Sequence, residues 1–506
     1  MNHFYFDKSL KNDADSGRLC RPVSVEDMME ARERGARLQE QLILTYQVPV
    51  VSFTLNIPGP VKILPGTEEF FRRGSESVRQ ALKQASVPIL FETQLRKHTG
   101  LELFLCADAE PEELKQITSS LEEETAGGRL YDIDIIRTDK SKVSREDIGL
   151  PGRRCLLCGE PAHACSRSRK HTVEDLVSHI QQLMAEETFL NHLYLAVRES
   201  LADEVSATPK PGLVDRLDSG AHRDMCFETF FKSADAVAPY IRAMAEQGIL
   251  CSRQVSDEKE PNLEILFSQI RKTGLLAETA MFDATGGVNT HKGIIFSMGI
   301  LAASAGFLFG QDRLNLPFLD LSELLSLAGK LCQKEIQEDF SALEQRRQQA
   351  EQGTEAGNIH FSHGEKLYLA YGSRGIRGEA SDGFPSLSSV SMTAFTSTLE
   401  VLGGKTEISE DVWNRACLQT LLSLMAQVED TNVIHRGGME AALYVREQAQ
   451  KALLDGGAVT DGWQERLSSM NQDFIEKNIS PGGCADLLAL TVFLLRLQGI
   501  SPKEYS

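Results

Sequence analysis

Five short segments in the second half of the chain combine glycines with acidic, basic and histidine side chains. Asp and Glu carboxylates are ligands that Mg²⁺ prefers, whereas Lys, Arg and the unpaired N–H groups at a helix start bind phosphate. Glycine lets the backbone approach a ligand closely. If the segments meet at one end of their domain, they would form a pocket for a nucleotide and its polyphosphate. They are residues 210–225, 282–293, 372–386, 428–438 and 479–490.

Each of these segments, taken alone, is also compatible with an ordinary capped helix or turn. None is a Walker A loop, because the pattern G-x-x-x-x-G-K-[ST] is absent from them. The number of such segments, rather than any one of them, favours a binding pocket. The pattern does not say which nucleotide chemistry follows.

The first part of the chain contains a second candidate metal site, in the strand-like sequence YDIDII. Side chains alternate along a strand, so Asp132 and Asp134 share one face while Ile133 and Ile135 point to the core. Adjacent carboxylates repel each other unless a cation lies between them, and Mg²⁺ with a substrate phosphate is one solution. The alternative is an edge strand that carries two solvent-facing acids.

A basic segment follows this strand. Residues 140–171 contain eight Lys and Arg against three Asp and Glu, or +5, in a chain whose net charge is −19. Such a segment suits phosphate recognition or an acidic protein partner. Arg145, Arg153 and Arg154 belong to it. Lys62, which follows a Pro-Gly-Pro turn, is either a further phosphate contact or part of an ordinary loop.

The same segment contains Cys155, Cys158, Cys165 and His171. Three cysteines and one histidine can form a tetrahedral zinc site. The spacing C-x2-C-x6-C-x5-H is not a familiar zinc-finger pattern, however. Of the two interpretations, zinc binding or reduced cysteines that pack a tight loop, the second is therefore favoured.

The secondary structure that must position these residues changes along the chain. Residues 1–180 alternate between helical and strand-like stretches, with a capping box expected at Ser24 and Asp27. They predict an α/β domain with one mixed sheet. Residues 181–506 have long helical windows and almost no strand signal, so they predict a larger all-α domain. The boundary is expected near residue 180.

The overall composition narrows the class of protein. A net charge of −19 argues against a general binder of nucleic acid or of anionic membranes. The apolar run at residues 293–310 is short for a bilayer span and is expected to be a buried helix. The first residues lack the pattern of a signal peptide. Ten scattered cysteines suit reduced thiols and a cytoplasmic location.

Two family resemblances extend this interpretation. Over residues 180–506 the chain resembles triphosphoribosyl-dephospho-CoA synthases, which make the precursor of the citrate lyase prosthetic group. That resemblance rests on the ordered motifs EVSATPKPGLVDRLDSGAHRDM, FDATGGVNTHKGIIFSMG, GIRGEASDGFPS, EDTNVIHRGG and ISPGGCADLLA. Residues 25–171 resemble apo-citrate lyase phosphoribosyl-dephospho-CoA transferases through RERGARLQEQL, SFTLNIPGPVK, GRLYDIDII and SREDIGLPGRRCLLCGEPAHACSRSRKH. The chain looks like a natural fusion with the transferase first.

The synthase resemblance implies that a ribose hydroxyl of 3′-dephospho-CoA attacks the anomeric carbon of ATP and expels adenine. Acids in the five segments would then hold Mg²⁺ or orient ribose: Asp215, Asp224, Glu379, Glu429 and Asp430. Phosphate contacts are expected from Lys210, Lys292, Arg377 and Arg436, and proton transfer from His222 or His291. Asn289 and Asp486 are expected to contact the nucleotide substrates.

The transferase resemblance implies a nucleotidyltransferase-like domain. A serine of the apo acyl-carrier subunit of citrate lyase would attack the α-phosphate of the first product and release pyrophosphate. Asp132 and Asp134 would hold Mg²⁺, while Lys62, Arg145, Arg153 and Arg154 would contact phosphate oxygens. The rival interpretation is an ADP-ribose-type glycohydrolase fused to a zinc-dependent adaptor that binds a carrier protein.

Overall fold

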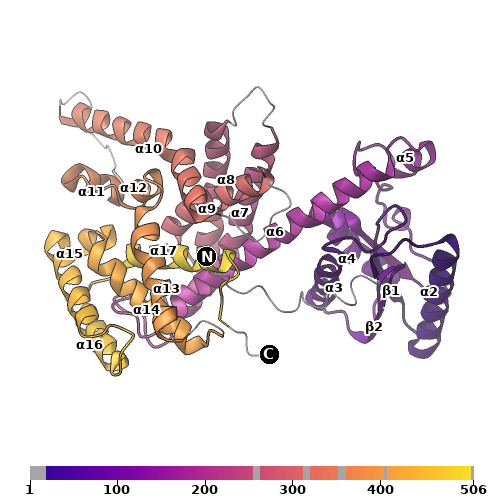
Figure 1. The fold of residues 1–506 in the computed structure, drawn as a ribbon, viewed down its shortest axis with the longest axis horizontal. Coiled ribbons are helices and arrows are strands. Elements are labelled where there is room, and N and C mark those ends of the chain that lie inside the picture. The colour runs from indigo at the N-terminus through magenta and orange to yellow at the C-terminus, as the bar shows by residue number, and fades with distance from the viewer. Residues whose placement is uncertain (1–18, 255–261, 312–319, 352–360, 404–406, 503–506) are drawn as a thin grey trace. The chain divides into compact units, whose positions relative to one another are not determined.

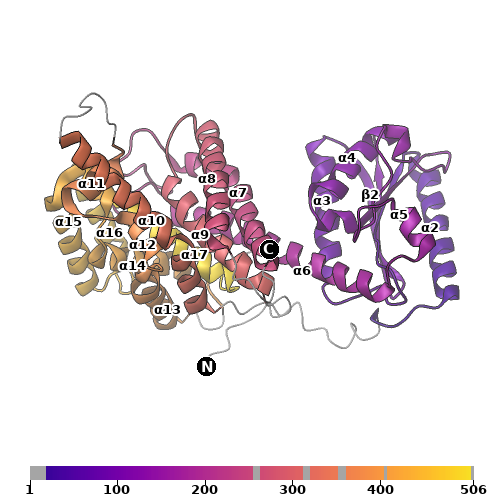
Figure 2. The same cartoon turned by 90° about the horizontal axis from the view of Figure 1, so that it is seen from above.

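The chain folds into two compact units that divide between Phe189 and Leu190 (Figures 1 and 2). This description comes from a computed structural model. It describes residues 19–254, 262–311, 320–351, 361–403 and 407–502. Each unit is treated by itself below.

The N-terminal unit contains a four-stranded sheet in the order β2-β3-β1-β4. Every neighbouring pair is antiparallel, so the predicted mixed sheet is wrong. The error follows from β2, an exposed edge strand that the sequence analysis missed and that forms a hairpin with β3. With β2 included, the order of elements is the split βαββαβ pattern, in which the parallel strands are never neighbours. The strands are β1 (Val50–Leu55), β2 (Ile89–Lys97), β3 (Gly100–Ala107) and β4 (Tyr131–Ile136).

Helices cover both faces of this sheet. Figure 2 shows the sheet between α2 (Val25–Tyr46) on one side and α3 (Thr67–Gln84) and α4 (Pro111–Glu124) on the other. The α3 and α4 face holds the larger apolar core, which includes Phe53 of β1 and Ile133 of β4. A smaller cluster packs under α2, whose start is fixed by the predicted capping box. After β4 the chain is irregular except for two short helices, η3 (Glu146–Ile148) and α5 (Ala162–Ser168).

The described part of the C-terminal unit is all-helical, as predicted. A long helix, α6 (Val173–Ser206), leads into it. The helices that follow are α7 (Phe227–Arg253), α8 (Leu263–Thr285), α9 (Lys292–Gln311), α10 (Leu321–Glu351), α11 (His363–Tyr371), α12 (Gly375–Ser381), η4 (Leu387–Ser391), α13 (Met392–Val401), α14 (Glu410–Gln427), α15 (Thr431–Leu454), α16 (Trp463–Glu476) and α17 (Gly482–Leu497).

Helix α9 is the central apolar element of this unit. Among the described helices it alone is long and apolar enough to cross a membrane, but 83% of its apolar window is buried inside the unit. The prediction of a buried core helix is therefore confirmed. It packs on α7 almost backbone to backbone, because a Cβ on Gly306 would collide with the carbonyl of Ala245. This contact sets how closely α9 approaches α7.

Candidate functional site

Helix starts and loops of the C-terminal unit surround a cavity of about 990 Å³. All five segments that the sequence analysis selected contribute to its wall, together with the first turns of α9, α15 and α17. The structure thus brings these segments to one place. The predicted residues that line the cavity are Lys210, His222, Asp224, Asn289, His291, Lys292, Glu379, Glu429, Asp430, Arg436 and Asp486.

Two predicted residues of this unit do not line the cavity. The buried carboxylate of Asp215 accepts hydrogen bonds from three backbone N–H groups of its own loop, at 2.7 to 3.2 Å. Burial raises the pKa of Asp215, while these hydrogen bonds lower it. Asp215 therefore shapes the loop. Arg377 is exposed to the side of α10, where it lies 3.9 Å from Asp339.

Lys210 is buried and paired with Glu204 of α6, a residue that the sequence analysis missed. The ammonium of Lys210 donates to the backbone oxygen of Glu204 at 2.8 Å and also to its carboxylate. A buried charge is stable only when it is paired in this way. The pair makes Lys210 a neutralised part of the wall rather than a free cation. Glu204 lies within a long helix, where no sequence signal marked it.

The ring of His291 is buried at the start of α9 and held by two hydroxyl groups. Thr290 Oγ1 donates to Ser233 Oγ at 2.7 Å, and Ser233 Oγ lies 2.6 Å from His291 Nδ1. Nδ1 is thus engaged by Ser233, whichever of the two atoms carries the shared proton. Nε2 has no hydrogen-bond partner in the described part of the chain. Burial lowers the pKa of His291 to about 3.

His222 is held in a comparable way from both sides. Arg436 Nη2 donates to its Nδ1 at 3.2 Å, so the neutral ring carries its proton on Nε2, which lies 2.7 Å from Ser480 Oγ. Burial, with the nearby Arg436 charge, lowers the pKa of His222 to about 4. Both ring nitrogens of His222 are engaged, whereas His291 has its Nδ1 engaged and its Nε2 buried without a hydrogen-bond partner among the described residues. Proton transfer by His222 or His291 stays a prediction.

Two carboxylates at the cavity differ sharply in their surroundings. Asp430 accepts hydrogen bonds from the backbone N–H groups of Asn432 and Val433, at 2.8 and 3.2 Å, and from that of Cys484 at 2.8 Å. It therefore caps α15 and binds the first turn of α17 at the same time. Burial raises the pKa of Asp430, and the three N–H groups lower it.

Asp486 has no such partners among the described residues. Burial, followed by the charges of Glu204 and Asp430, raises the pKa of Asp486 well above its usual value. Its carboxylate occupies the space beside Gly293, since a Cβ at that glycine would collide with Oδ2. The side chain is thus a protonatable acid that lines the cavity next to the first turn of α9.

The rim of the cavity has further ion pairs and hydrogen bonds. The Glu379 carboxylate accepts from Ser386 Oγ at 2.6 Å, and Lys292 Nζ lies 2.8 Å from Glu278. Arg374, which the sequence analysis did not select, lines the cavity and pairs with Asp382. Arg374 belongs to the same Gly-rich segment as Arg377. The segment was therefore recognised, but the arginine selected from it was not the one on the wall.

The N-terminal unit contains a second cavity, of about 1130 Å³, beside the irregular segment that follows β4. Its wall is basic. The arginines that line it are the predicted Arg145, Arg153 and Arg154, together with Arg129 and Arg169, which the sequence analysis did not select.

These arginines differ in how far their charges are neutralised. The buried carboxylate of Glu122 accepts from Arg145 at 3.0 Å and from Arg153 at 2.5 Å. In the described part of the chain, the guanidinium of Arg154 has only the backbone oxygen of Gly159, at 3.2 Å. Arg129, Arg154 and Arg169 therefore have no acidic partner among the described residues, and they are the cations of this wall that are most available to an anion.

The carboxylates of β4 lie on the face predicted for them. Asp132 and Asp134 are on the outer face, while Ile133 and Ile135 are buried in the core on the other. Asp132 Oδ1 lies 3.5 Å from Arg153 Nη2, which connects it to the basic cavity, whereas Asp134 pairs with Lys142. Neither carboxylate lines the cavity itself.

Lys62 is not among the residues that line this cavity. Its ammonium donates to the backbone oxygen of Ile57 at 2.7 Å, and burial lowers its pKa. The neighbouring Asn56 and Pro58, from the same loop, do line the cavity. The loop was correctly recognised, but its lysine stabilises the turn.

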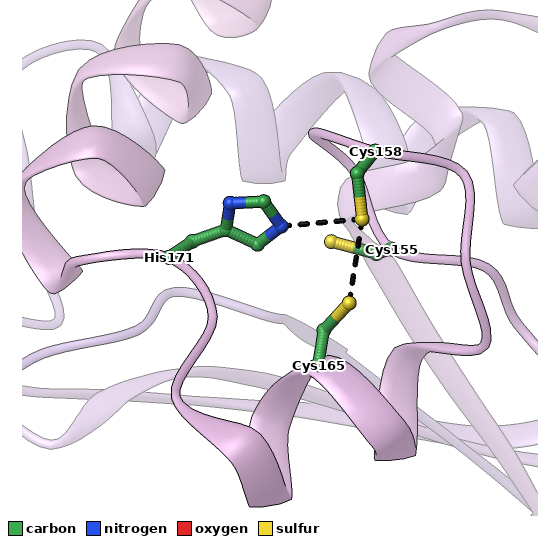
Figure 3. Close-up of side chains that lie close together, drawn as sticks. All are labelled: Cys155, Cys158, Cys165 and His171. Carbon is green, nitrogen blue, oxygen red and sulfur yellow. Dashed lines mark hydrogen bonds between the residues drawn. The ribbon is translucent and has the colours of Figure 1, made fainter.

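Figure 3 shows the side chains of Cys155, Cys158, Cys165 and His171 directed at one another. Cys158 Sγ lies 3.3 Å from Cys165 Sγ and 3.2 Å from His171 Nε2. All four potential ligand atoms lie within 4.8 Å of one another, and no other such group occurs among the described residues. Hydrogen bonds, first from the backbone N–H of Glu160 and then from His171, lower the pKa of Cys158 to about 6.

Comparisons with known proteins assign both units. Residues 191–504 match the family model CitG, described as ATP:dephospho-CoA triphosphoribosyl transferase, and residues 23–187 match CitX, described as apo-citrate lyase phosphoribosyl-dephospho-CoA transferase. The chain is 33% identical to protein CitXG of Haemophilus influenzae over 94% of this chain and 97% of that relative. It is 29% identical to protein CitXG of Leuconostoc mesenteroides subsp. cremoris over 94% and 98%.

A single-activity relative covers the C-terminal unit. The 2-(5''-triphosphoribosyl)-3'-dephosphocoenzyme-A synthase of Klebsiella pneumoniae is 36% identical over 63% of this chain and 93% of its own length. The rival interpretation, a glycohydrolase fused to an adaptor, is not supported by these matches.

We expect both cavity histidines to stay neutral at mildly acidic pH. With pKa values of about 4 for His222 and about 3 for His291, their imidazole NMR signals should not shift between pH 8 and pH 5.5. His222→Gln and His291→Gln variants assign the signals, and a shift in that window would contradict the hydrogen-bonding scheme.

Because both rings bind protons less readily in the folded chain, they should also lower the free energy of unfolding as the pH falls below about 6.5.

Proposed function

This chain belongs to the CitXG family, and we propose from that premise that its two cavities perform successive steps on one polypeptide. It is a bifunctional enzyme that makes the prosthetic group of citrate lyase and attaches it. This proposal is supported by two family matches, to residues 23–187 and to residues 191–504. Each matched part of the chain forms a compact unit with its own cavity. The synthase is assigned to the C-terminal unit and the transferase to the N-terminal unit.

In the synthase step, ATP and 3′-dephospho-CoA give 2′-(5″-triphosphoribosyl)-3′-dephospho-CoA and adenine. The 2′-oxygen of dephospho-CoA forms a bond to the anomeric carbon of ATP and the bond from that carbon to adenine breaks. The proton removed from the hydroxyl is passed on to the departing adenine nitrogen, so that adenine leaves as a neutral base. Lys292, Arg374 and Arg436 line the cavity as cations for the triphosphate, for which Lys292 would exchange its pairing with Glu278 and Arg374 its pairing with Asp382. The helix starts of α9, α15 and α17 add N–H groups and favourable dipoles.

We assign the removal of the hydroxyl proton to Asp486. The buried alternatives at the wall are engaged: Glu204 by Lys210, Asp430 by three N–H groups, and the two imidazoles by hydroxyl or guanidinium groups. The exposed carboxylates of Glu429 and Asp224 are assigned to Mg²⁺ below. Asp486 has no partner among the described residues and lines the cavity. A carboxylate with a raised pKa is also better matched to a hydroxyl proton than an ordinary one.

Mg²⁺ fits this cavity as a companion of the triphosphate. In the described part of the chain, no three carboxylates approach closely enough to hold a metal without help. Mg²⁺ commonly uses one or two carboxylates together with substrate phosphates. Of the predicted ligands, Glu429 and Asp224 line the wall and are exposed, whereas Asp430 is occupied by N–H groups. We therefore place the ion with Glu429 and Asp224.

In the transferase step, a serine oxygen of the apo acyl-carrier subunit forms a bond to the α-phosphorus, and the bond to the departing pyrophosphate breaks. The nucleotidyltransferase-like assignment rests on Asp132 and Asp134 for Mg²⁺ and on the arginine wall for pyrophosphate. Arg154 is one of the cations available there, since Glu122 holds Arg145 and Arg153 while Arg154 has only a backbone oxygen as partner among the described residues. We keep the cytoplasmic location as part of the proposal, supported by ten cysteines that are all free.

Two coupled measurements test the assignment. The purified chain is incubated with ATP and Mg²⁺, with or without 3′-dephospho-CoA, and adenine is measured by chromatography. The apo acyl-carrier subunit is then added and its intact mass recorded. We expect adenine only with dephospho-CoA, followed by a carrier mass increased by one phosphoribosyl-dephospho-CoA. Adenine or ribose products formed without dephospho-CoA would contradict the synthase step, and an unmodified carrier would contradict the transferase step.

Substitution of Asp486 should stop the first step. We expect Asp486→Asn to slow adenine release by about 10²-fold or more, because the proton acceptor is lost while the shape is kept. In the unmodified chain the rate should rise with pH as Asp486 ionises, at a higher pH than for an ordinary Asp because its pKa is raised. The variant should lose that limb. Asp461→Asn, on an exposed loop, is the control, and equal rates in both variants would reject the assignment.

Arg154 should affect only the second step. We expect Arg154→Ala to lower the initial rate of carrier modification by at least about tenfold, since one charge-assisted phosphate contact is lost. Adenine release should be unchanged, because that step is assigned to the other unit. Arg72→Ala, at an exposed Glu69 pair on α3, is the matched control. Normal carrier modification by Arg154→Ala would remove this residue from the site.

A further inference from the structure

The four side chains of Figure 3 have the composition of a structural zinc site, and we propose that they bind one Zn²⁺. The ligand set would be Cys155 Sγ, Cys158 Sγ, Cys165 Sγ and His171 Nε2. Neither the family descriptions nor the proposed reactions assign a metal to this segment. The inference is independent of the proposed function, because it concerns the stability of the N-terminal unit.

The distances fit tetrahedral coordination after small adjustments. With Zn–S bonds of about 2.3 Å and Zn–N bonds of about 2.1 Å, ligand atoms in a tetrahedron lie roughly 3.5 to 3.8 Å apart. Here Cys158 Sγ lies 3.3 Å from Cys165 Sγ and 3.2 Å from His171 Nε2, and every pair is within 4.8 Å. An ion at the centre would require shifts of a few tenths of an ångström for the closest pairs. Four protein ligands leave no open position, so the site would be structural and not catalytic.

The backbone around the first two cysteines already has the form of a metal-binding turn. The backbone N–H of Cys155 donates to Glu160 O at 2.6 Å, and that of Gly159 donates to Cys155 O at 3.2 Å. Gly159 has a φ of +70°, which allows the chain to reverse directly after Cys158. The C-x2-C spacing of this turn falls within the range of known zinc sites. His171 approaches from the other side, after α5.

The local fold needs such a link. Between β4 and α6 the regular structure consists of η3 and the seven-residue α5. The cluster joins the turn before α5, α5 itself through Cys165, and the loop after it through His171. A disulfide would join Cys158 and Cys165 but would leave Cys155 and His171 without a role. Hydrogen-bonded thiols alone would contribute little stability to so irregular a segment.

The zinc loop would also hold the transferase cavity together. Cys155, Cys165 and His171 line that cavity beside the arginines. Arg129 Nη2 donates to the backbone oxygens of Arg154 and Cys155, at 3.0 and 3.2 Å. A metal that fixes Cys155 therefore fixes the backbone that presents Arg154. Loss of the ion should disorder the basic wall while leaving the C-terminal unit folded.

The decisive measurement is the metal content of the full-length chain purified without chelator. Inductively coupled plasma mass spectrometry should find about one zinc per chain, which a strong chelator removes together with part of the thermal stability. Cys158→Ser and His171→Ala should fall to near zero, whereas His171→Cys should keep zinc because it provides a four-cysteine set. Cys20→Ser, an exposed cysteine of the same unit, should leave the content unchanged.

Two further measurements cover variants that fail to fold. The metal-free, reduced, unmodified chain should take up Co²⁺ and develop the visible absorption of a tetrahedral cobalt–thiolate site, which added Zn²⁺ should abolish. Adenine release should be unaffected throughout, which separates failure of the zinc site from failure of the synthase assignment. The proposal is overturned if the reduced chain binds neither ion, or if the native chain has an intact mass lowered by two hydrogens with Cys158 and Cys165 joined.

Discussion

A single buried carboxylate fixes the starts of two helices at the synthase cavity. Asp430 accepts from backbone N–H groups of α15 and also from Cys484 in α17. N–H groups at a buried helix start must find acceptors, and an anion site needs those starts to face the ligand. Both demands are met because Gly483 has no side chain. A Cβ at that position would lie only 3.2 Å from the carboxylate of Asp430. The wall residues on the first turns of α15 and α17 are positioned by this clamp.

The same constraint separates structural from reactive groups in each cavity. A charge away from water needs a partner, so most charged side chains here have one. Lys210 neutralises Glu204 in the synthase, and Glu122 holds two arginines in the transferase. Asp486 and Arg154 are among the groups left without a charged partner in the described part of the chain, and such groups have free energy to gain from a substrate. Similar charged side chains therefore differ in function according to whether a charged partner already neutralises them.

The sequence predicted elements and segments better than individual side chains. Glycine-rich polar segments between apolar helices are a local signal, so all five cavity segments were found. Pairing is not local: Glu204 lies in a helix without distinguishing neighbours, and Asp215 was indistinguishable from a ligand until its backbone partners were known. The edge strand β2 was missed because few of its residues are buried, and this error produced the wrong sheet type. The Cys₃His group was found, but its spacing could not show that the four side chains meet.

Helix α9 combines the most buried packing of the C-terminal unit with a reactive first turn. Its body packs against the backbone of α7 at Gly306, and its start carries His291 and the glycine that accommodates Asp486. A substitution that shifts the helix along its axis would move both at once. Divergence among relatives should therefore be slow in α9 even at positions remote from the nucleotide, while the outward-facing side of the unit drifts freely. New substrate preferences would have to arise at exposed side chains of the rim, away from that shared axis.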